Sequence, residues 1–190
     1  LSSTNGGAGC PGLTATGSVW TWGANNNGQL GNGGSDASNH PTAIRMNNGG
    51  MGNNTMIAIA AGYDHGLALK NDNTIKAWGA NSSGQCGNGN TTSPQVNAVN
   101  VDLTNLAGRT ISKIAAGGSH SLILCSDGTV WAWGLNAYGQ LGDGTTTNST
   151  VPIQTDLTAL GGRTVIAVEG SYYHSIALCS DGSVWAWGYN

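Results

Sequence analysis

The sequence predicts an all-β fold, a β-propeller of roughly 55-residue blades, of which about three and a half are present. Three observations lead there: a tryptophan motif at regular spacing, strands that are apolar on both faces, and turn residues between the strands. The motif Trp-x-Trp-Gly, or a close variant, places its second Trp at positions 22, 78, 133 and 187, in steps of 56, 55 and 54 residues. A regular period of this length is typical of a repeat architecture.

The third unit shows most plainly how a blade is expected to form. Residues 114–117, 120–125 and 129–134 are three short apolar runs. Asp127 and Gly128 separate the last two runs, and an Asp-Gly pair supplies the left-handed backbone of a tight hairpin turn. Each unit is therefore expected to contain three consecutive antiparallel strands.

The strand at 129–134 is predicted to be buried on both faces. Successive side chains of a strand point to opposite sides, so Trp131 and Trp133 share one face, while Val130 and Ala132 share the other. A sheet with one wet face would alternate polar and apolar residues instead. Blades that cover one another, with large Trp against small Ala and Val, satisfy this pattern.

A fourth, outer strand is expected after a glycine-rich loop in each unit. Residues 135–142 form such a loop in the third unit. The next strands are predicted to begin at Pro41, Pro94 and Pro152. Proline is tolerated at a strand start or a sheet edge but not in a central ladder. Four short strands per unit match the pattern of a propeller blade.

The composition disfavours two classes of partner. Only 8% of the residues are charged, the net charge is -3, and the six basic residues form no run. A nucleic-acid groove would show a basic patch, so no nucleic-acid partner is expected. No apolar stretch approaches the roughly 18 residues that span a membrane. The low charge and the many Gly, Asn, Ser and Thr residues resemble a secreted bacterial protein, so we expect an extracellular or cell-surface location.

The four cysteines are expected to be small buried side chains. Cys10, Cys86, Cys125 and Cys179 include no Cys-x-x-Cys pair, and nothing in their spacing supports a zinc site or a disulfide framework.

One long motif recurs in register along the chain. Residues 117–142 read Gly-x-x-His-x-Leu-x-Leu, then Asp-Gly-x-Val-Trp-x-Trp-Gly, then Asn-x-x-Gly-Gln-Leu-Gly. This pattern resembles the repeat of the regulator of chromosome condensation family, and the resemblance extends from about Leu13 to Asn190. It implies a propeller of about seven blades. Members of that family act as nucleotide-exchange factors, chromatin binders or secreted β-lactamase inhibitors; the first two roles suit basic, nuclear chains.

The units differ in several places. Lys76 replaces a Trp, and the four steps from Gly170 to His174, against three from Gly117 to His120, suggest one inserted residue. We expect one domain, 1–190, with units at about 13–62, 63–117, 118–170 and an incomplete 171–190. Such a partial ring would be completed by further blades of a longer chain or by a second copy.

Residues shared by every unit are interpreted as structural. One His per unit precedes the second Trp by 13 residues, and equivalent positions in different blades cannot easily converge on one metal ion. We therefore expect each His to fix its blade through hydrogen bonds. The predicted structural core comprises Trp20, Trp22, Trp78, Trp131, Trp133, Trp185, Trp187, His65, His120 and His174. No catalytic residue, metal site or cofactor is predicted, since Asp72, Asp127 and Asp181 stand in turns and form no carboxylate pair.

Residues that differ between units are the candidates for function. Tyr is enriched in binding hot spots because it offers rigid area and a polar tip. Glu169 is the only Glu and is aligned with Ala61 and Ala116. The predicted partner-binding residues are Tyr63, Asp64, Tyr138, Glu169, Tyr172 and Tyr173. An alternative interpretation is that the Tyr rings only cover neighbouring turns.

The sequence thus favours a non-enzymatic, protein-binding scaffold, part of a secreted or surface propeller that uses its loop face. Two alternatives remain open. The chain could be a structural subunit that assembles through unpaired blade edges into a fibre or coat, or a polysaccharide-binding module whose aromatic rings stack on sugars.

Overall fold

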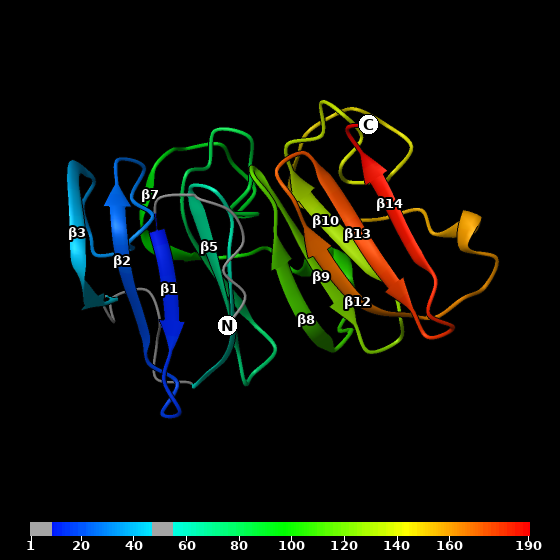
Figure 1. The fold of residues 1–190 in the computed structure, drawn as a ribbon, viewed down its shortest axis with the longest axis horizontal. Coiled ribbons are helices and arrows are strands. Elements are labelled where there is room, and N and C mark those ends of the chain that lie inside the picture. Colours follow the sequence, from blue (N-terminus) through cyan, green and yellow to red (C-terminus); the bar gives the residue numbers. More distant parts are fainter. Residues whose placement is uncertain (1–8, 47–54) are drawn as a thin grey trace.

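Four antiparallel sheets follow one another along the chain in the computed structural model, which describes residues 9–46 and 55–190 (Figure 1). Blade 1 contains β1 (Gly9–Leu13), β2 (Val19–Asn25) and β3 (Asp36–Arg45). Blade 2 contains β4 (Met56–Ala61), β5 (His65–Lys70), β6 (Ile75–Gly79) and β7 (Gln95–Asn100). Blade 3 contains β8 (Ile111–Ala116), β9 (His120–Cys125), β10 (Val130–Gly134) and β11 (Ser149–Gln154). Blade 4 contains β12 (Val165–Gly170), β13 (His174–Cys179) and β14 (Val184–Gly188).

The strand order confirms the predicted all-β fold, a partial β-propeller. Each described sheet is a meander of neighbouring antiparallel strands, and blades 2 and 3 have the predicted four strands. The innermost strands β4, β8 and β12 lie in sequence against one another. Two short 3-10 turns, η1 (Thr104–Leu106) and η2 (Thr158–Leu160), precede β8 and β12 and bury Leu106 and Leu160.

The sheets begin one strand earlier than the repeat units expected from the motif. Blade 2 starts at Met56 where the unit was placed at 63, and blade 3 starts at Ile111 where the unit was placed at 118. The reason is pairing: β8 pairs with β9, which follows it, so the apolar run before each His belongs to the same sheet as the His strand.

The predicted insertion before His174 is wrong. Gly170 is paired with Ser175 in the same way that Ala116 is paired with Ser121, and β8 and β12 both contain six residues. Gly170 therefore corresponds to Ala116 and not to Gly117. A Cβ at Gly170 would lie 2.5 Å from the backbone nitrogen of Gly117, so close approach of two blades explains this glycine.

The corrected register also moves Glu169. It corresponds to Ala115 and Ala60, since Glu169 is paired with Ile176 as Ala115 is with Leu122 and Ala60 is with Leu67. The alignment with Ala61 and Ala116 was one residue out of register, which in a strand exchanges the two faces.

Three apolar clusters fill the spaces between successive blades. Between blades 2 and 3, Trp131 and Trp133 pack with Ile75 and Ala77, the large-against-small arrangement expected from the sequence. Corresponding clusters lie between blades 1 and 2 and between blades 3 and 4. Burial between blades thus supplies most of the core, because each sheet is covered on both faces only when both neighbours are present.

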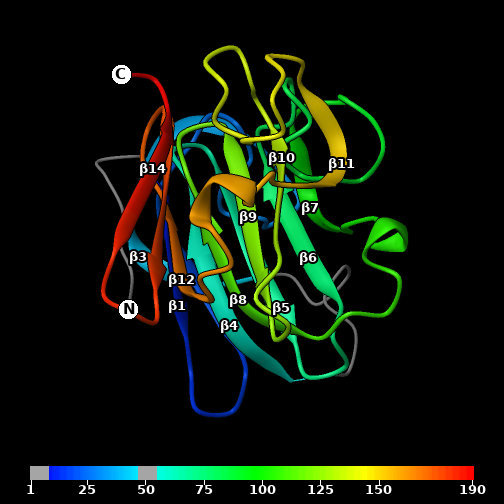
Figure 2. The same cartoon turned by 90° about the vertical axis from the view of Figure 1, so that its right-hand side faces the viewer.

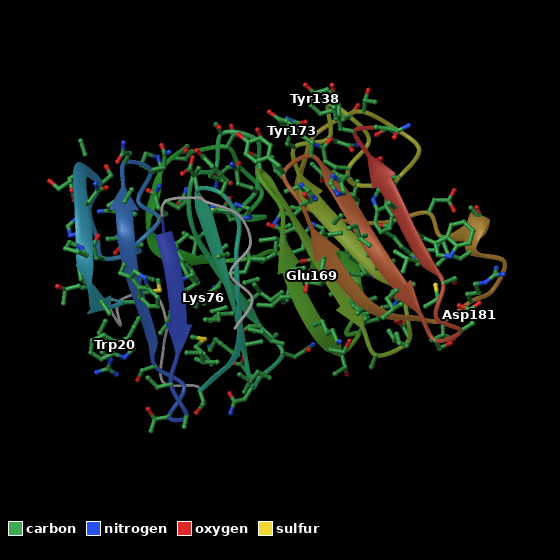
Figure 3. The ribbon with its side chains drawn as sticks, in the orientation of Figure 1. Trp20, Lys76, Tyr138, Glu169, Tyr173 and Asp181 are labelled. Carbon is green, nitrogen blue, oxygen red and sulfur yellow. The ribbon has the colours of Figure 1, made fainter. Side chains whose placement is uncertain are left out.

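The tryptophans are buried to different degrees. Trp78, Trp131 and Trp133 are buried, whereas Trp22, Trp185 and Trp187 are half-buried. Trp20 departs from the predicted core because it is 37% exposed. It lies on the face of blade 1 that points away from blade 2, near the lower end of the strands in Figure 3.

The hairpin turns follow the predicted chemistry. Gly128 has φ +83°, and the Asp127 carboxylate accepts hydrogen bonds from the backbone nitrogen and hydroxyl of Thr129. In blade 2, Asn73 takes the glycine position with φ 67°, which Asn tolerates better than other residues. Cys86, Cys125 and Cys179 are buried free thiols, and burial raises the pKa of Cys86 to about 12; the side chain of Cys10 lies outside the described residues.

Candidate functional site

Two ends of the molecule must be distinguished before the site is described. Strands β2, β6, β10 and β14 all run from the β-hairpin turns toward the opposite end, where the long loops emerge. Figure 2 shows the β10–β11 loop and the C-terminus at one end and the β1–β2 hairpin at the other. We call these the tyrosine end and the hairpin end.

All five tyrosines of the chain meet at the tyrosine end. The shortest ring-centroid distances are 4.4 Å for Tyr172–Tyr173, 4.8 Å for Tyr138–Tyr189 and 5.1 Å for Tyr138–Tyr173. Tyr63 joins through Tyr172 at 5.4 Å. These four pairs meet edge to face, an arrangement that aromatic rings prefer. We call these residues the tyrosine cluster: Tyr63, Tyr138, Tyr172, Tyr173 and Tyr189.

The cluster is assembled from loops of three blades. Tyr63 lies between β4 and β5, Tyr172 and Tyr173 lie between β12 and β13, Tyr138 lies between β10 and β11, and Tyr189 follows β14. Figure 3 shows Tyr138 and Tyr173 beside each other above the strands. Sequence reasoning singled out four of the five but missed Tyr189. The available signal was that Tyr189 stands where Ala24, Ala80 and Leu135 follow the Trp-Gly pairs of the other units.

A glycine of the intervening blade lets the rings of Tyr63 and Tyr172 meet. Gly118 corresponds to both tyrosines, and its nitrogen donates to the carbonyl of Tyr172 while its carbonyl accepts from the nitrogen of Tyr63. A Cβ at Gly118 would lie 2.4 Å from the carbonyl oxygen of Tyr172. The inner loops are therefore joined through their backbones, and the cluster rests on a fixed frame.

The outer loop that carries Tyr138 is also held firmly. The buried Asn136 amide donates to the Asp143 carboxylate and to two loop carbonyls, and its oxygen accepts from the nitrogen of Leu141. The nitrogen of Tyr138 donates to the Gln140 side chain. Each residue of the tyrosine cluster is 37% to 60% exposed, so the cluster is a pre-arranged surface.

Asp64 lies next to the tyrosine cluster. It follows Tyr63, is half-buried, and accepts a hydrogen bond from the Gln29 amide of blade 1 at 2.9 Å. Burial raises the pKa of this carboxyl. The pKa of Tyr172 is also raised, chiefly by Tyr173, with a smaller contribution from the Asp64 charge. Asp64 and Tyr172 thus share one electrostatic environment.

Glu169 is separate from the tyrosine cluster. It is exposed on the face of blade 4 that points away from blade 3, beside His174, Ile176 and Leu178. On blade 3 the corresponding face is covered by blade 4. We call this surface the open face; it comprises Glu169, His174, Ile176, Leu178, Val184 and Ala186. An open hollow of about 560 Å³ adjoins it, lined by His174, Ala186 and residues 187–190.

His65 and His120 make contacts between blades. The Nε2 of His65 lies 2.9 Å from the Ser121 hydroxyl of the next blade, and that hydroxyl donates to the Gln85 carbonyl. The indole nitrogen of Trp133 donates to the same carbonyl. His120, Ser175, Gln140 and Trp187 repeat the arrangement one blade later. We call each such set of four residues a clasp.

The clasp fixes the protonation of each buried histidine. Because the serine hydrogen goes to the glutamine carbonyl, the histidine Nε2 must donate to the serine oxygen. The Nδ1 atoms of His65 and His120 have no hydrogen-bond partner in the described structure. Burial lowers the pKa of His65 to about 3 and that of His120 to about 4. Both are neutral and structurally engaged, which leaves them unsuited to proton transfer near neutral pH.

No group of three or more His, Cys, Asp or Glu side chains that could hold a metal ion occurs among residues 9–46 and 55–190. The helical segments of the described chain are all too short to cross a membrane.

Comparisons with known proteins agree with this architecture. The sequence model of the regulator of chromosome condensation (RCC1) repeat matches residues 16–69, 74–124 and 127–178. The chain is 32% identical over 181 residues to the ultraviolet-B receptor UVR8 of Arabidopsis thaliana, covering 95% of this chain and 39% of the receptor. It is 35% identical over 130 residues to the RCC2 homolog of Danio rerio, covering 68% of this chain and 25% of that protein.

Solved structures show the same fold. Human WBSCR16 superposes with a TM-score of 0.81 at 26% identity, over 96% of this chain and 45% of that one. A chain in the structure of Kap60 bound to yeast RCC1 (Prp20) superposes with a TM-score of 0.78 at 24% identity, over 97% of this chain and 42% of that one. The chain therefore spans less than half the length of each of these relatives.

Proposed function

Because this chain belongs to the RCC1 repeat family, we propose that it is a non-enzymatic protein-binding scaffold whose binding surface is the tyrosine cluster. The observation that carries the proposal is the gathering of all five tyrosines, half-exposed, on one fixed frame. Tyr offers a large rigid area at low entropy cost and is enriched where proteins bind each other.

The relatives support a binding role. One solved relative, Prp20 from Saccharomyces cerevisiae, is described in one structure as bound to Kap60 and in another by its binding properties to Gsp1p and histones. The partner of this chain is a separate question, which likeness of fold does not answer. The extracellular or cell-surface setting, and the bacterial origin, remain predictions from composition.

Crosslinking tests the proposal. A photoreactive amino acid at Tyr138 should capture a partner protein from the source organism, and Tyr172→Ala with Tyr173→Ala should abolish capture while changing the melting temperature little. The matched control is the same probe at Lys113, which is exposed in the half of β8 nearer the hairpin end. It should capture none of the proteins that the probe at Tyr138 captures. Equal capture from both positions, or a large fall in melting temperature for the Tyr variants, would show that the rings only cover their neighbouring turns.

The open face favours a second candidate, association with another blade-like surface. His174 stands where His65 and His120 meet a serine of the next blade, and Val184 and Leu178 are 66% and 36% exposed. We propose that this face is covered by a further blade, from a longer chain or from a second copy. Sedimentation velocity over a range of concentrations tests the second-copy case. If the chain associates and Val184→Lys abolishes the association, the second-copy case is supported. If the chain stays monomeric at every concentration, that case is contradicted.

A further inference from the structure

We propose that the tyrosine cluster with Asp64 receives a basic peptide segment, whose Arg or Lys side chains lie against the exposed tyrosine rings. This inference rests on the proposed protein-binding function and names the chemistry of the partner. It follows from three observations: the distribution of charge along the molecule, the arrangement of the rings, and a contact that the chain already makes twice elsewhere.

The basic residues are confined to one end, where they offset five Asp residues: Asp72, Asp102, Asp127, Asp156 and Asp181. All six basic residues lie at the hairpin end or in strand halves that begin or end there. These residues are Arg45, Lys70, Lys76, Arg109, Lys113 and Arg163. The tyrosine end holds Asp36, Asp64 and Asp143 and none of the six. Four histidines also lie at this end. His40 is hydrogen-bonded to Asp36 in blade 1, burial lowers the pKa of His65 and His120, and His174 lies on the open face. The tyrosine end therefore attracts cations and repels phosphate and other anions.

The ring arrangement suits a cation. The face of an aromatic ring carries negative charge density and its edge carries positive. In each edge-to-face pair the edge of one ring lies against one face of the other, while each tyrosine keeps at least 37% of its surface exposed. A guanidinium or ammonium group that lies within about 6 Å of an exposed ring centre is attracted by this charge density.

The hairpin end shows the same recognition within the chain. The Arg109 guanidinium lies 5.6 Å from the centre of the Trp131 ring, and its Nε donates to Asp127 at 2.9 Å. Arg163 makes the equivalent contacts with Trp185 and Asp181. In both places a guanidinium contacts an aromatic ring and a carboxylate. Tyr63, Tyr172 and Asp64 supply a ring and a carboxylate together at the other end, where the chain provides no Arg or Lys of its own.

The environment of the Asp64 carboxylate also favours a positively charged partner. Its carboxylate is half-buried, and the Gln29 amide is a neutral donor. Burial raises its pKa, which reflects a charge that is incompletely compensated. A partner guanidinium beside it would compensate that charge, as Arg109 does for Asp127.

Fluorescence anisotropy with labelled short peptides tests the inference. The probes are an alternating Arg-Gly peptide and its Gln-Gly and Glu-Gly counterparts, titrated with the 190-residue chain at low salt. We expect the Arg peptide to bind, the Gln peptide to bind weakly and the Glu peptide not to bind. Added salt should weaken the Arg complex. Equal binding of the Arg and Glu peptides, or no binding of the Arg peptide, overturns the inference.

Matched variants locate the site. Tyr172→Phe keeps the ring and should keep the affinity, whereas Tyr172→Leu keeps apolar area but loses the ring and should weaken Arg-peptide binding about two- to five-fold. Asp64→Asn should weaken it by a similar factor, and Asp156→Asn at the hairpin end should change nothing. Equal affinities of the Leu and Phe variants, or an unchanged Asp64→Asn variant, contradict the proposal.

The outcomes also separate this inference from the proposed function. In one outcome, no Arg peptide binds, the probe at Tyr138 still captures a protein, and Tyr172→Ala abolishes that capture. The scaffold function then stands, and the proposal of a basic partner is wrong. If a neutral glucan oligosaccharide binds instead, with Asp64→Asn unchanged, the tyrosine end is a sugar-binding surface and both proposals fail.

Discussion

Strands β10 and β14 contain the same five residues, Val-Trp-Ala-Trp-Gly, yet the structure buries them differently. Every residue of β10 is buried, and Val130 is 0% exposed, because blades 2 and 4 cover the two faces of blade 3. In β14 no residue is fully buried, and Val184 is 66% exposed. The burial of a strand in this fold is therefore determined by the two neighbouring blades and not by the sequence of the strand.

The largest expected effect comes from the second Trp of each strand. Trp133→Ala should lower the free energy of unfolding by about 3–5 kcal/mol, since it opens a cavity in the cluster between blades 2 and 3. Trp187→Ala should cost clearly less, because that ring is only half-buried. Urea unfolding followed by circular dichroism measures both. If both variants lost the same free energy of unfolding, the contribution of this Trp to stability would not depend on how completely neighbouring blades bury it.

Acid should destabilise the chain through the two complete clasps. The folded-state pKa values of about 3 for His65 and about 4 for His120 lie below the unfolded value of 6.5. The unfolded chain therefore binds more protons between pH 6.5 and pH 4, and the free energy of unfolding falls as pH decreases, by up to about 1.4 kcal/mol per pH unit for each His. Thermal unfolding across this range measures the slope, and His120→Phe should reduce it.

Substitutions of the clasp histidine and of its counterpart on the open face should have effects of intermediate size. His120→Asn breaks a buried hydrogen bond to Ser175 and should cost about 1–3 kcal/mol. His174→Asn, on the open face, should be nearly neutral in the isolated chain. If a second copy covers the open face, the His174 variant should instead weaken association, which sedimentation velocity would detect.

The smallest effects are expected in the hairpin turns, where blades 3 and 4 are alike. Asp127 and Asp181 each bind the residue two places ahead and an Arg from before the first strand of their own blade. Asp127→Ala and Asp181→Ala should therefore give small and equal decreases in melting temperature, each below that of His120→Asn. Unequal decreases would mean that neighbouring blades also influence these exposed turns.

The blade could be predicted from the sequence because its information is local. Alternating side chains along β10 determine which residues share a face, and Asp127-Gly128 determines the turn. The register across β12 could not be read in this way, because Gly170 was aligned with Gly117 by residue type, whereas pairing with Ser175 decides its position. Glu169 replaces an Ala in either register, but only the corrected register places it on the open face.

The tyrosine cluster was only partly predictable for a related reason. Its members come from loops of three blades, so their contacts depend on how far each blade is rotated from the last, which the period alone does not specify. Tyr63 and Tyr172 are separated by more than a hundred residues in the chain, and between them Gly118 leaves room for the backbone of Tyr172. The sequence showed where units differ, and the three-dimensional arrangement brought the differences together.

The two complete clasps have a consequence for how such chains grow. The serine and tryptophan of one blade complete a contact that the histidine and glutamine of the preceding blade begin, as Ser121 and Trp133 do for His65 and Gln85. A unit that carries all four residues therefore fits before or after any other such unit. Gene duplication can therefore insert a whole unit without redesigning either junction.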